Sequence, residues 1–571
     1  MEKRFTQALV AGVERVAAWA DLLDDINVFP VADGDTGRNL VVSLSPLRQT
    51  ALGRQVIIRE LLLSARGNSG NIAARFFSGL LMADSAENLA GAIRQGRDRA
   101  WQAVSDPKPG TMLTVFDTLA DALEETPATF DATWSEGVIG KLEAAVLATP
   151  ELLPKLKAAG VVDAGALGVF IYMEGFFNAL TGNTGAFRPI TEVFGKYLKI
   201  SPAFQESDET GCCVDTVLQV GGDDKETLKR LSAIGESVVV LRDGEYLKVH
   251  LHAADGEKAR GDLAAVGDVV RWSADDLDAQ ISSFRRRRVD LPIHIMTDAA
   301  GSVNRENAAE LGVTLLDSYI TVGDKCLPET HFAPEEHYAA MRRGVRVSTS
   351  QASVFERHEH YQSLLKRYPR VLYLCVGSVF TGNYAVATEW KKANDPEDRF
   401  TVIDSQAASG RLGILVVAAA RFARAARNAE AVIDFARAGA ARCREYVFLD
   451  KLQYLAAGGR LSKTSAFFGD VLHMKPIISP LAEGAKKMGV VRDRAGQLAF
   501  ALDKLAVLGE GENALIMLEY SDNAEWVAGA VQPEIARLHP LAEILLHPLS
   551  LTSGAHMGPG TWAVAFLPAE P

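Results

Sequence analysis

Two aspartates, Asp33 and Asp35, flank a glycine in a polar loop between two helical patterns. Carboxylates crowded at positions i and i+2 repel one another unless a cation lies between them, and hard oxygen ligands suit Mg²⁺. Thr36 and Gly37 follow the pair, and a helical pattern resumes at Asn39. The residues alone leave a second interpretation open, an Asp-Gly turn followed by a helix N-cap, which would explain Asp35 and Thr36 without a metal.

Three further glycine-containing turns occur in the same helical region. The first, residues 65–70, offers backbone N–H groups and the hydroxyl of Ser69 just before the next helix. Such a turn at a helix N-terminus is suited to binding phosphate. The other two turns are residues 109–111 and 162–168. Together the four loops favour nucleotide phosphates and Mg²⁺ at one end of a helical bundle.

A second set of ligand types lies in the middle of the chain. His250 and His252 alternate along a predicted strand, so both imidazoles project from the same face. Cys213 precedes another predicted strand, which can pair nearby. One thiolate and two imidazoles make a three-ligand zinc set with an open fourth position. The alternative is a pair of packed or solvent-facing histidines beside a buried cysteine.

Four short elements after residue 340 carry groups that can bind an anion. Hydroxyls, a guanidinium and an imidazole, without a nucleophile–base arrangement, suit a carboxylate head group. The alternatives are helix caps for the hydroxyls and a surface salt bridge for the arginine. The residues concerned are Ser348, Thr349, Thr381, Gly382, Arg460 and His556.

The elements that must position these groups fall into three regions. Residues 1 to about 190 carry apolar side chains at three- and four-residue steps, typical of amphipathic helices. After residue 211, β-branched strands surround a Glu/Lys-rich helix, which predicts a small α+β unit. From about residue 290, short strands such as 371–376 alternate with helices, which predicts an α/β sheet. We expect a multidomain protein with three domains, at residues 1–195, 205–285 and 290–571.

Composition restricts the class of protein. The 571 residues include 60 basic and 72 acidic side chains, a formal charge of −12, which argues against a dedicated nucleic-acid binder. Uninterrupted apolar stretches, such as residues 412–420, are shorter than the ~20 residues that a bilayer requires. The N-terminus shows no signal-peptide pattern, and five scattered cysteines make no disulfide framework. We expect a soluble, cytoplasmic protein, with peripheral contact at the inner membrane face as an option.

The N-terminal motifs resemble the ATP-binding DhaL-type (DAK2) domain, in the version of bacterial fatty acid kinase rather than that of dihydroxyacetone kinase. The resemblance covers about residues 1–190 and implies an antiparallel helical barrel, in which Asp33 and Asp35 hold Mg²⁺ beneath ATP. Asn27 stands near the position where related kinases have a further acidic ligand. The motifs that carry the resemblance are residues 27–37, 65–70, 110–114 and 162–165. The nucleotide contacts that it implies are Thr36, Asn39, Ser69, Gly70 and Thr111.

The rest of the chain resembles two further components of the same system. The segment from Cys213 to His252 is similar to the central domain of fatty acid kinase, where a cysteine and a His-x-His pair bind zinc, and Cys213, His250 and His252 match that set. From residue 293 onward the chain resembles the DegV family, the fatty-acid-binding partners of fatty acid kinase. This resemblance implies a two-lobed α/β protein that encloses one acyl chain. The residues that it places near the acyl carboxylate are Ser348, Thr349, Thr381, Arg460 and His556.

The combination predicts a self-contained fatty acid kinase, which transfers the γ-phosphoryl group of ATP to a bound fatty acid and yields acyl phosphate and ADP. Asp33 and Asp35 are expected to hold the metal, and Arg460 and His556 to orient the acceptor. A carboxylate is already deprotonated at neutral pH, so no general base is required. Two alternatives stay open: a kinase for a small polyol, and a non-catalytic lipid carrier or sensor regulated by nucleotide.

The expected cofactors are ATP, Mg²⁺ and Zn²⁺, and the expected ligand is a fatty acid. Burial of the chain contributes ~0.8 kcal/mol per CH₂, which favours extraction of the lipid during a transient contact with a membrane surface. An acyltransferase that consumes the product is a candidate partner, whereas no nucleic acid is expected. A homodimer through the helical domain is one alternative for the oligomeric state.

Overall fold

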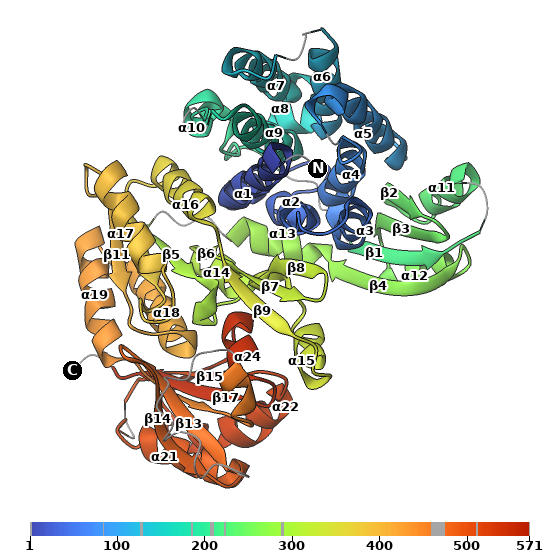
Figure 1. Ribbon diagram of the computed structural model, residues 1–571. Helices are drawn as coiled ribbons and strands as arrows, with labels where there is room; N and C mark the ends of the chain where they lie inside the picture. The colour runs from blue at the N-terminus through green and yellow to red at the C-terminus, as the bar shows by residue number, and fades with distance from the viewer. Residues whose placement is uncertain are drawn as a thin grey trace. The chain divides into compact units, whose positions relative to one another are not determined.

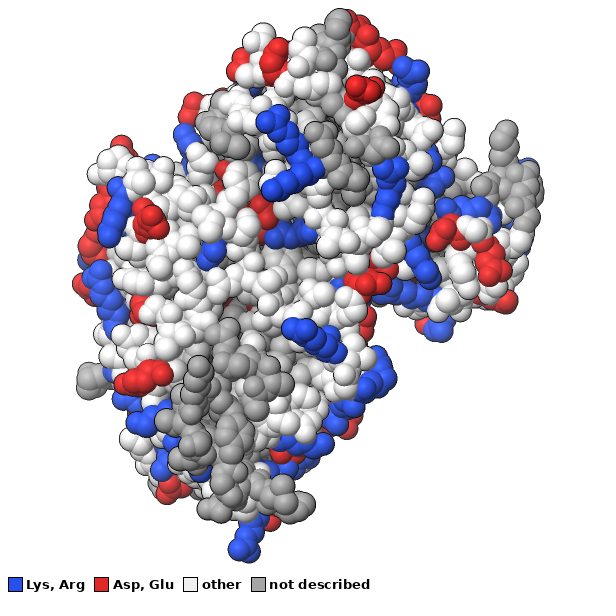
Figure 2. All heavy atoms as spheres, in the orientation of Figure 1, with Lys and Arg blue, Asp and Glu red and all other residues white. Residues whose placement is uncertain are grey.

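The computed structural model describes residues 3–83, 85–125, 129–183, 187–205, 211–221, 224–286, 291–457, 474–509 and 512–569. The chain divides into two compact units, Met1–Arg286 and Arg287–Pro571. The first unit contains the helical region together with the small sheet that the sequence predicts after residue 211. On the face drawn in Figure 2, basic and acidic side chains are interspersed among uncharged ones.

Helices form the N-terminal region of the first unit (Figure 1). They are α1 (Lys3–Asp25), α2 (Thr36–Leu44), α3 (Arg54–Ser64), α4 (Gly67–Leu80), α5 (Leu89–Ala103), α6 (Met112–Glu125), α7 (Ala132–Leu152), α8 (Pro154–Ala159), α9 (Ala164–Thr181) and α10 (Ile190–Val193). Helix α9 packs along α1, is predominantly apolar and is buried on nearly all sides, as expected of a helix at the centre of a bundle. Among the described helices it alone is long and apolar enough to cross a membrane, and 89% of it is buried.

The second part of the first unit is an antiparallel sheet with the strand order β2-β3-β1-β4. Its strands are β1 (Cys212–Gln219), β2 (Glu236–Asp243), β3 (Tyr246–Ala253) and β4 (Asp268–Asp276), and the accompanying helices are α11 (Asp224–Ser232), α12 (Gly256–Ala264) and α13 (Leu277–Arg286). Val239 and Leu241 of β2 belong to the same apolar core as the helices. This shared core fixes the sheet against the helical region.

The described residues of the second unit form three sheets. A parallel sheet has the order β11-β10-β5-β6, a mixed sheet β14-β13-β12-β17-β15-β16, and a small antiparallel sheet β8-β7-β9. Their strands are β5 (His294–Asp298), β6 (Val313–Leu316), β7 (Ser318–Val322), β8 (Lys325–Pro328), β9 (Val347–Gln351), β10 (Val371–Cys375), β11 (Phe400–Asp404), β12 (Arg444–Phe448), β13 (Lys475–Leu481), β14 (Gly484–Val491), β15 (Leu515–Tyr520), β16 (Glu543–Pro548) and β17 (Trp562–Leu567).

One long helix joins the two larger sheets of this unit. The apolar side chains of α18 (Ser409–Ala425) pack in one core with Ile295 and Leu374 of the parallel sheet and Met517 and Ala565 of the mixed sheet. The helices are α14 (Arg305–Leu311), α15 (Pro334–Arg342), α16 (Val354–Arg367), α17 (Asn383–Asn394), α18 (Ser409–Ala425), α19 (Ala429–Arg442), α20 (Gln453–Ala457), α21 (Arg494–Leu505), α22 (Ala524–Trp526), α23 (Gln532–Leu538) and α24 (Leu551–Met557). The chain is thus multidomain, helical in its N-terminal region and α/β in its C-terminal region, whereas the barrel and the two lobes stay predictions.

Close packing of α1 against α2 generates a stability prediction. A Cβ atom on Gly37 would lie 2.0 Å from the backbone oxygen of Ala20, so Gly37→Ala must displace α2. We expect a loss of about 1–3 kcal/mol in the free energy of unfolding, the usual cost of overpacking. The matched control is Gly91→Ala in α5, where an added Cβ would meet open space among the described residues. That variant should gain about 0.5–1 kcal/mol through helix propensity. Urea denaturation of both variants checks the opposite signs.

Candidate functional site

A cavity of about 580 Å³ in the first unit brings most of the predicted metal and nucleotide residues together. This volume lies within the range of small-molecule sites. The wall includes the loop between α1 and α2, the start of α4, and the neighbouring strands β1 and β3. The predicted residues on this wall are Asp33, Asp35, Thr36, Ser69, Thr111, Cys213, His250 and His252.

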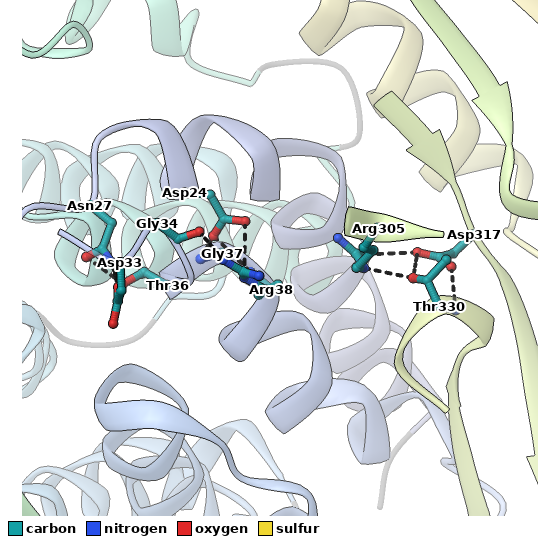
Figure 3. A network of polar contacts seen from close by, with 10 residues as sticks. All are labelled: Asp24, Asn27, Asp33, Gly34, Thr36, Gly37, Arg38, Arg305, Asp317 and Thr330. Carbon is teal, nitrogen blue, oxygen red and sulfur yellow. Dashed lines mark hydrogen bonds and ion pairs between the residues drawn. The ribbon is translucent and has the colours of Figure 1, made fainter. Parts of the chain in front are cut away.

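The helix cap of α2 comes from a residue that the sequence analysis overlooked. The carboxylate of Asp24, in α1, accepts hydrogen bonds from the backbone N–H groups of Gly37 at 2.7 Å and Arg38 at 3.2 Å (Figure 3). Asp35 occupies the N-cap position, but its side chain makes no capping hydrogen bond among the described residues. The capping interpretation of Asp35 is therefore wrong, and its carboxylate is left for the cavity.

Asp33 lies beside Asp35 in a buried position. Asn27 donates a side-chain hydrogen bond to Asp33 and accepts one from the hydroxyl of Thr36 at 3.0 Å (Figure 3). Burial, followed by the charge of Asp35, raises the pKa of Asp33 well above its usual value, while Arg38 partly offsets the effect. Two carboxylates held together in this way favour a bound cation, and oxygen ligands of this kind fit Mg²⁺.

The glycine loop at residues 65–70 leads into α4. A Cβ on Gly67, whose φ is +60°, would lie 2.1 Å from the side-chain nitrogen of Asn39, and one on Gly70 would lie 2.0 Å from the hydroxyl of Ser43. Asn39 and Gly70 thus pack α2 against α4, and neither is among the described residues that line the cavity. Their predicted nucleotide contacts stay predictions. Ser69 does line the cavity.

Strand register places the cysteine beside the two histidines. Cys213 pairs with His252 across β1 and β3, and the ligand atoms of Cys213, His250 and His252 all lie within 4.8 Å of one another. The Cys213 Sγ atom is 3.9 Å from both ring nitrogens of His250. The neighbouring thiol of Cys212 instead donates to the carbonyl of Ala253 at 3.4 Å. The geometry therefore identifies Cys213 as the cysteine of this cluster.

The electrostatics of the cluster also favour a cation. Burial raises the pKa of the Cys213 thiol well above its usual value, and the charges of Asp215, Asp35 and Asp33 add to the rise. Burial and the neighbouring His250 lower the pKa of His252 to about 3, so its imidazole is neutral. A thiol and two imidazoles in this arrangement match the donor set of a three-ligand zinc site.

Three charged residues of this unit had no assigned role in the sequence analysis. Asp163 lines the cavity and caps α9 by accepting the backbone N–H of Ala166 at 2.7 Å, and burial raises its pKa to about 7. Asp215 and Lys248 project from the sheet toward the glycine loop. The signal for Asp215 was present, because the spacing Cys213-x-Asp215 places both side chains on one face of a strand.

In the second unit the structure joins two of the predicted acyl-binding residues. Thr349 Oγ1 of β9 lies 3.5 Å from Nε2 of His556 in α24. Ser348, the preceding residue of the strand, projects from the opposite face. Arg460 lies outside the described residues.

The turn before α17 is tied to the same strand through polar side chains. Arg357 donates to Gln351 of β9 at 3.3 Å and to Asn383 at 2.7 Å, and Asn383 donates to the buried Asp298 at 2.7 Å. The residues predicted in this turn are Thr381 and Gly382, which directly precede α17. A separate network lies at the residue before β7, where Arg305 and Thr330 both donate to Asp317 (Figure 3).

Three family models match consecutive parts of the chain. The DAK2 domain matches residues 30–178, the FakA-like middle domain of fatty acid kinases matches residues 209–284, and the DegV family, described as uncharacterised, matches residues 292–569.

Curated relatives are similar to part of the chain. An uncharacterized protein of Staphylococcus saprophyticus is 32% identical over 334 residues, which are 53% of this chain and 60% of the relative. Protein YloV of Bacillus subtilis is 30% identical over 314 residues, 49% of this chain and 56% of the relative. The chain thus spans little more than half the length of these relatives.

Solved structures are similar to about half of the chain. The fatty-acid-binding DegV family protein of Thermus thermophilus is 24% identical, with a TM-score of 0.45, and covers 49% of this chain and 100% of its own. DegV of Bacillus subtilis, a fatty acid binding protein, is 20% identical, with a TM-score of 0.44 and the same coverage. From the family matches, the chain combines a DAK2 domain, a FakA-like middle domain of the fatty acid kinase type, and a DegV-family domain.

Proposed function

We propose that the chain is a self-contained fatty acid kinase. The observation that carries the proposal is the pair Asp33 and Asp35 on the cavity wall of a DAK2 domain, in the same chain as a DegV-family domain. Asp33 and Asp35 would hold Mg²⁺. When bound, this ion would neutralise the negative charges of the ATP phosphates. Thr36, Ser69 and Thr111 are proposed to contact the nucleotide.

The acceptor in this proposal is the carboxylate of a fatty acid in the DegV-family domain. A carboxylate oxygen forms the new bond to the γ-phosphorus, and the bond to the bridging oxygen breaks, which releases ADP. Thr349 and His556 would hydrogen-bond the acyl carboxylate, with Arg460, Ser348, Thr381 and Gly382 as further proposed contacts. Phosphoryl transfer of this kind depends mainly on positioning and charge stabilisation. Membrane contact, a homodimer and an acyltransferase partner stay predictions.

The proposal is tested by mass spectrometry of the purified protein before and after MgATP, with hydroxylamine present to trap an acyl phosphate. A co-purified fatty acid that becomes a hydroxamate only with MgATP is the expected result. A retained fatty acid without ATP-dependent hydroxamate would favour a lipid carrier or sensor. ADP release with a short polyol, in a protein that retains no lipid, would favour the polyol kinase.

Replacing Asp33 should separate phosphoryl transfer from lipid binding. Asp33→Asn removes a charged cation ligand, and we expect ATP-dependent hydroxamate formation to fall by about 10²-fold or more. The amount of retained fatty acid, measured in the same sample, should not change. The matched control is Asp121→Asn on the exposed side of α6, which should retain the wild-type rate. A wild-type rate for Asp33→Asn would contradict the metal assignment.

Replacing Thr349 should have the converse effect. Thr349→Val keeps the shape of the side chain but loses the hydroxyl beside His556. Loss of a hydrogen bond to a charged group should weaken fatty acid binding by about tenfold or more, while MgATP affinity is retained. Titration with a fluorescent fatty acid measures the change. Ser350→Ala, on the opposite face of β9, is the control, and an equal loss in both variants would exclude a specific role for Thr349.

The cysteine pair offers an internal test of the zinc proposal. Cys213→Ser replaces the thiol that lies among the two imidazoles, and Cys212→Ser replaces the thiol that faces Ala253. We expect zinc, measured by elemental analysis of protein purified in zinc-containing buffer, to be lost from the first variant and kept in the second, because a hydroxyl is a poor substitute for a thiolate ligand. Equal zinc content in both variants would refute the proposed ligand set.

A further inference from the structure

The proposed zinc cluster and the glycine loop meet at one side chain, Asp215. Its Oδ2 atom lies 3.4 Å from Nδ1 of His250 and accepts a hydrogen bond from the backbone N–H of Gly67 at 3.3 Å. Its Oδ1 atom accepts from the side-chain amide of Asn71 at 3.4 Å. Gly67 and Asn71 belong to the start of α4, which carries the cavity-lining Ser69. One carboxylate thus contacts a histidine of the cluster and the backbone of the loop.

Other contacts hold the same loop in a fixed place. The ammonium of Lys248, in β3, donates to the carbonyl of Ala65, and the hydroxyl of Ser43, in α2, accepts the N–H of Arg66 at 3.0 Å. Among the described residues, the loop is therefore hydrogen-bonded to α2 through Arg66 and to the sheet through Ala65 and Gly67. Among these contacts, the one at Gly67 is made by the carboxylate that also lies beside His250, so it can respond directly to a change at the cluster.

We propose that Asp215 is a positioning residue that couples cation binding at Cys213, His250 and His252 to nucleotide binding at the loop beginning at Gly67. The inference rests on the proposed function, because it takes the cavity to be a nucleotide site. A histidine that binds a metal through one ring nitrogen donates its other N–H to a carboxylate, which fixes both groups. Here the fixed carboxylate is the acceptor of Gly67, so a bound cation preorganises the loop.

The sign and the reciprocity of the effect follow from this arrangement. A preorganised loop loses less conformational freedom when it binds phosphate, so zinc should tighten nucleotide binding. By thermodynamic linkage the nucleotide must tighten zinc binding by the same factor. A direct attraction between the cation and the phosphates would also couple the two ligands, but that attraction would persist without Asp215. Removal of the side chain therefore distinguishes the two explanations.

The test measures two affinities and needs no turnover. The dissociation constant of MgATP is determined by calorimetry for zinc-loaded and zinc-stripped full-length protein, and zinc affinity by competition with a chromogenic chelator, with and without MgATP. In the wild type we expect zinc to tighten MgATP binding by about fivefold or more. Asp215→Ala should bring the ratio of the MgATP dissociation constants without and with zinc to about one. Asp215→Asn, which keeps an acceptor oxygen for Gly67, should restore part of the wild-type ratio. The control is Asp262→Ala on the exposed side of α12, which should keep the wild-type ratio.

Each failure has a distinct signature. A wild type that binds no MgATP refutes the proposed nucleotide site and, with it, the inference. A wild type that binds both ligands without coupling, or an Asp215→Ala variant that keeps the full ratio, overturns the inference and leaves the kinase proposal standing. If the variants do not fold, the inference is tested instead by the rate of hydrogen exchange of the Gly67 amide in the wild type, with and without zinc. Zinc should slow that exchange, and an unchanged rate would overturn the inference.

Discussion

The cap that Asp24 supplies to α2 is the interaction on which the candidate site depends. A helix N-terminus requires an acceptor for its free N–H groups, and an aspartate at the N-cap position commonly supplies that acceptor. Because Asp24 reaches across from α1 to Gly37 and Arg38, Asp35 is released from this task. Two carboxylates can then face one cavity. Without the cap from α1, the same loop would be an ordinary helix start.

The close approach of the two helices makes this cap possible. Gly37 lies against the backbone of Ala20, where a larger residue would hold α2 away from α1 and from Asp24. The absence of a side chain at Gly37 thus allows close packing of the two helices and the hydrogen bond from Gly37 to Asp24. On the other side of the cavity, the apolar core shared by β2 and the helices keeps the cysteine and histidine cluster close to the carboxylates. The candidate metal ligands of the helical region and of the sheet therefore line one cavity.

The sequence was sufficient to predict most of the elements, whereas the chemistry assigned to the loops stays a prediction. The apolar run at residues 371–376 corresponds to β10, Val371–Cys375, because a buried parallel strand reads as a continuous apolar segment. The His-x-His spacing placed both imidazoles by the period of a strand. The strand face of Asp215 could also be predicted from the Cys213-x-Asp215 spacing. Its contact with Gly67 and the cap from Asp24 had no comparable signal, because each joins segments that are distant in sequence. The family resemblance implied a nucleotide contact for Asn39, which stays a prediction, and the packing of its side chain against Gly67 could not be predicted from the sequence.

The presence of both domains on one chain lowers the affinity that the donor and acceptor sites of the proposed reaction need for one another. Donor and acceptor sites on separate proteins must associate tightly enough to meet at cellular concentrations. Two sites on one chain meet at an effective concentration that can be on the order of millimolar, so a weak interaction is sufficient for transfer. Weak contact has the advantage that the acyl phosphate can leave the donor site after transfer. Under the proposed function, selection then acts on the geometry of each site, through residues such as Asp24, Asp215 and Thr349, more than on an interface between them.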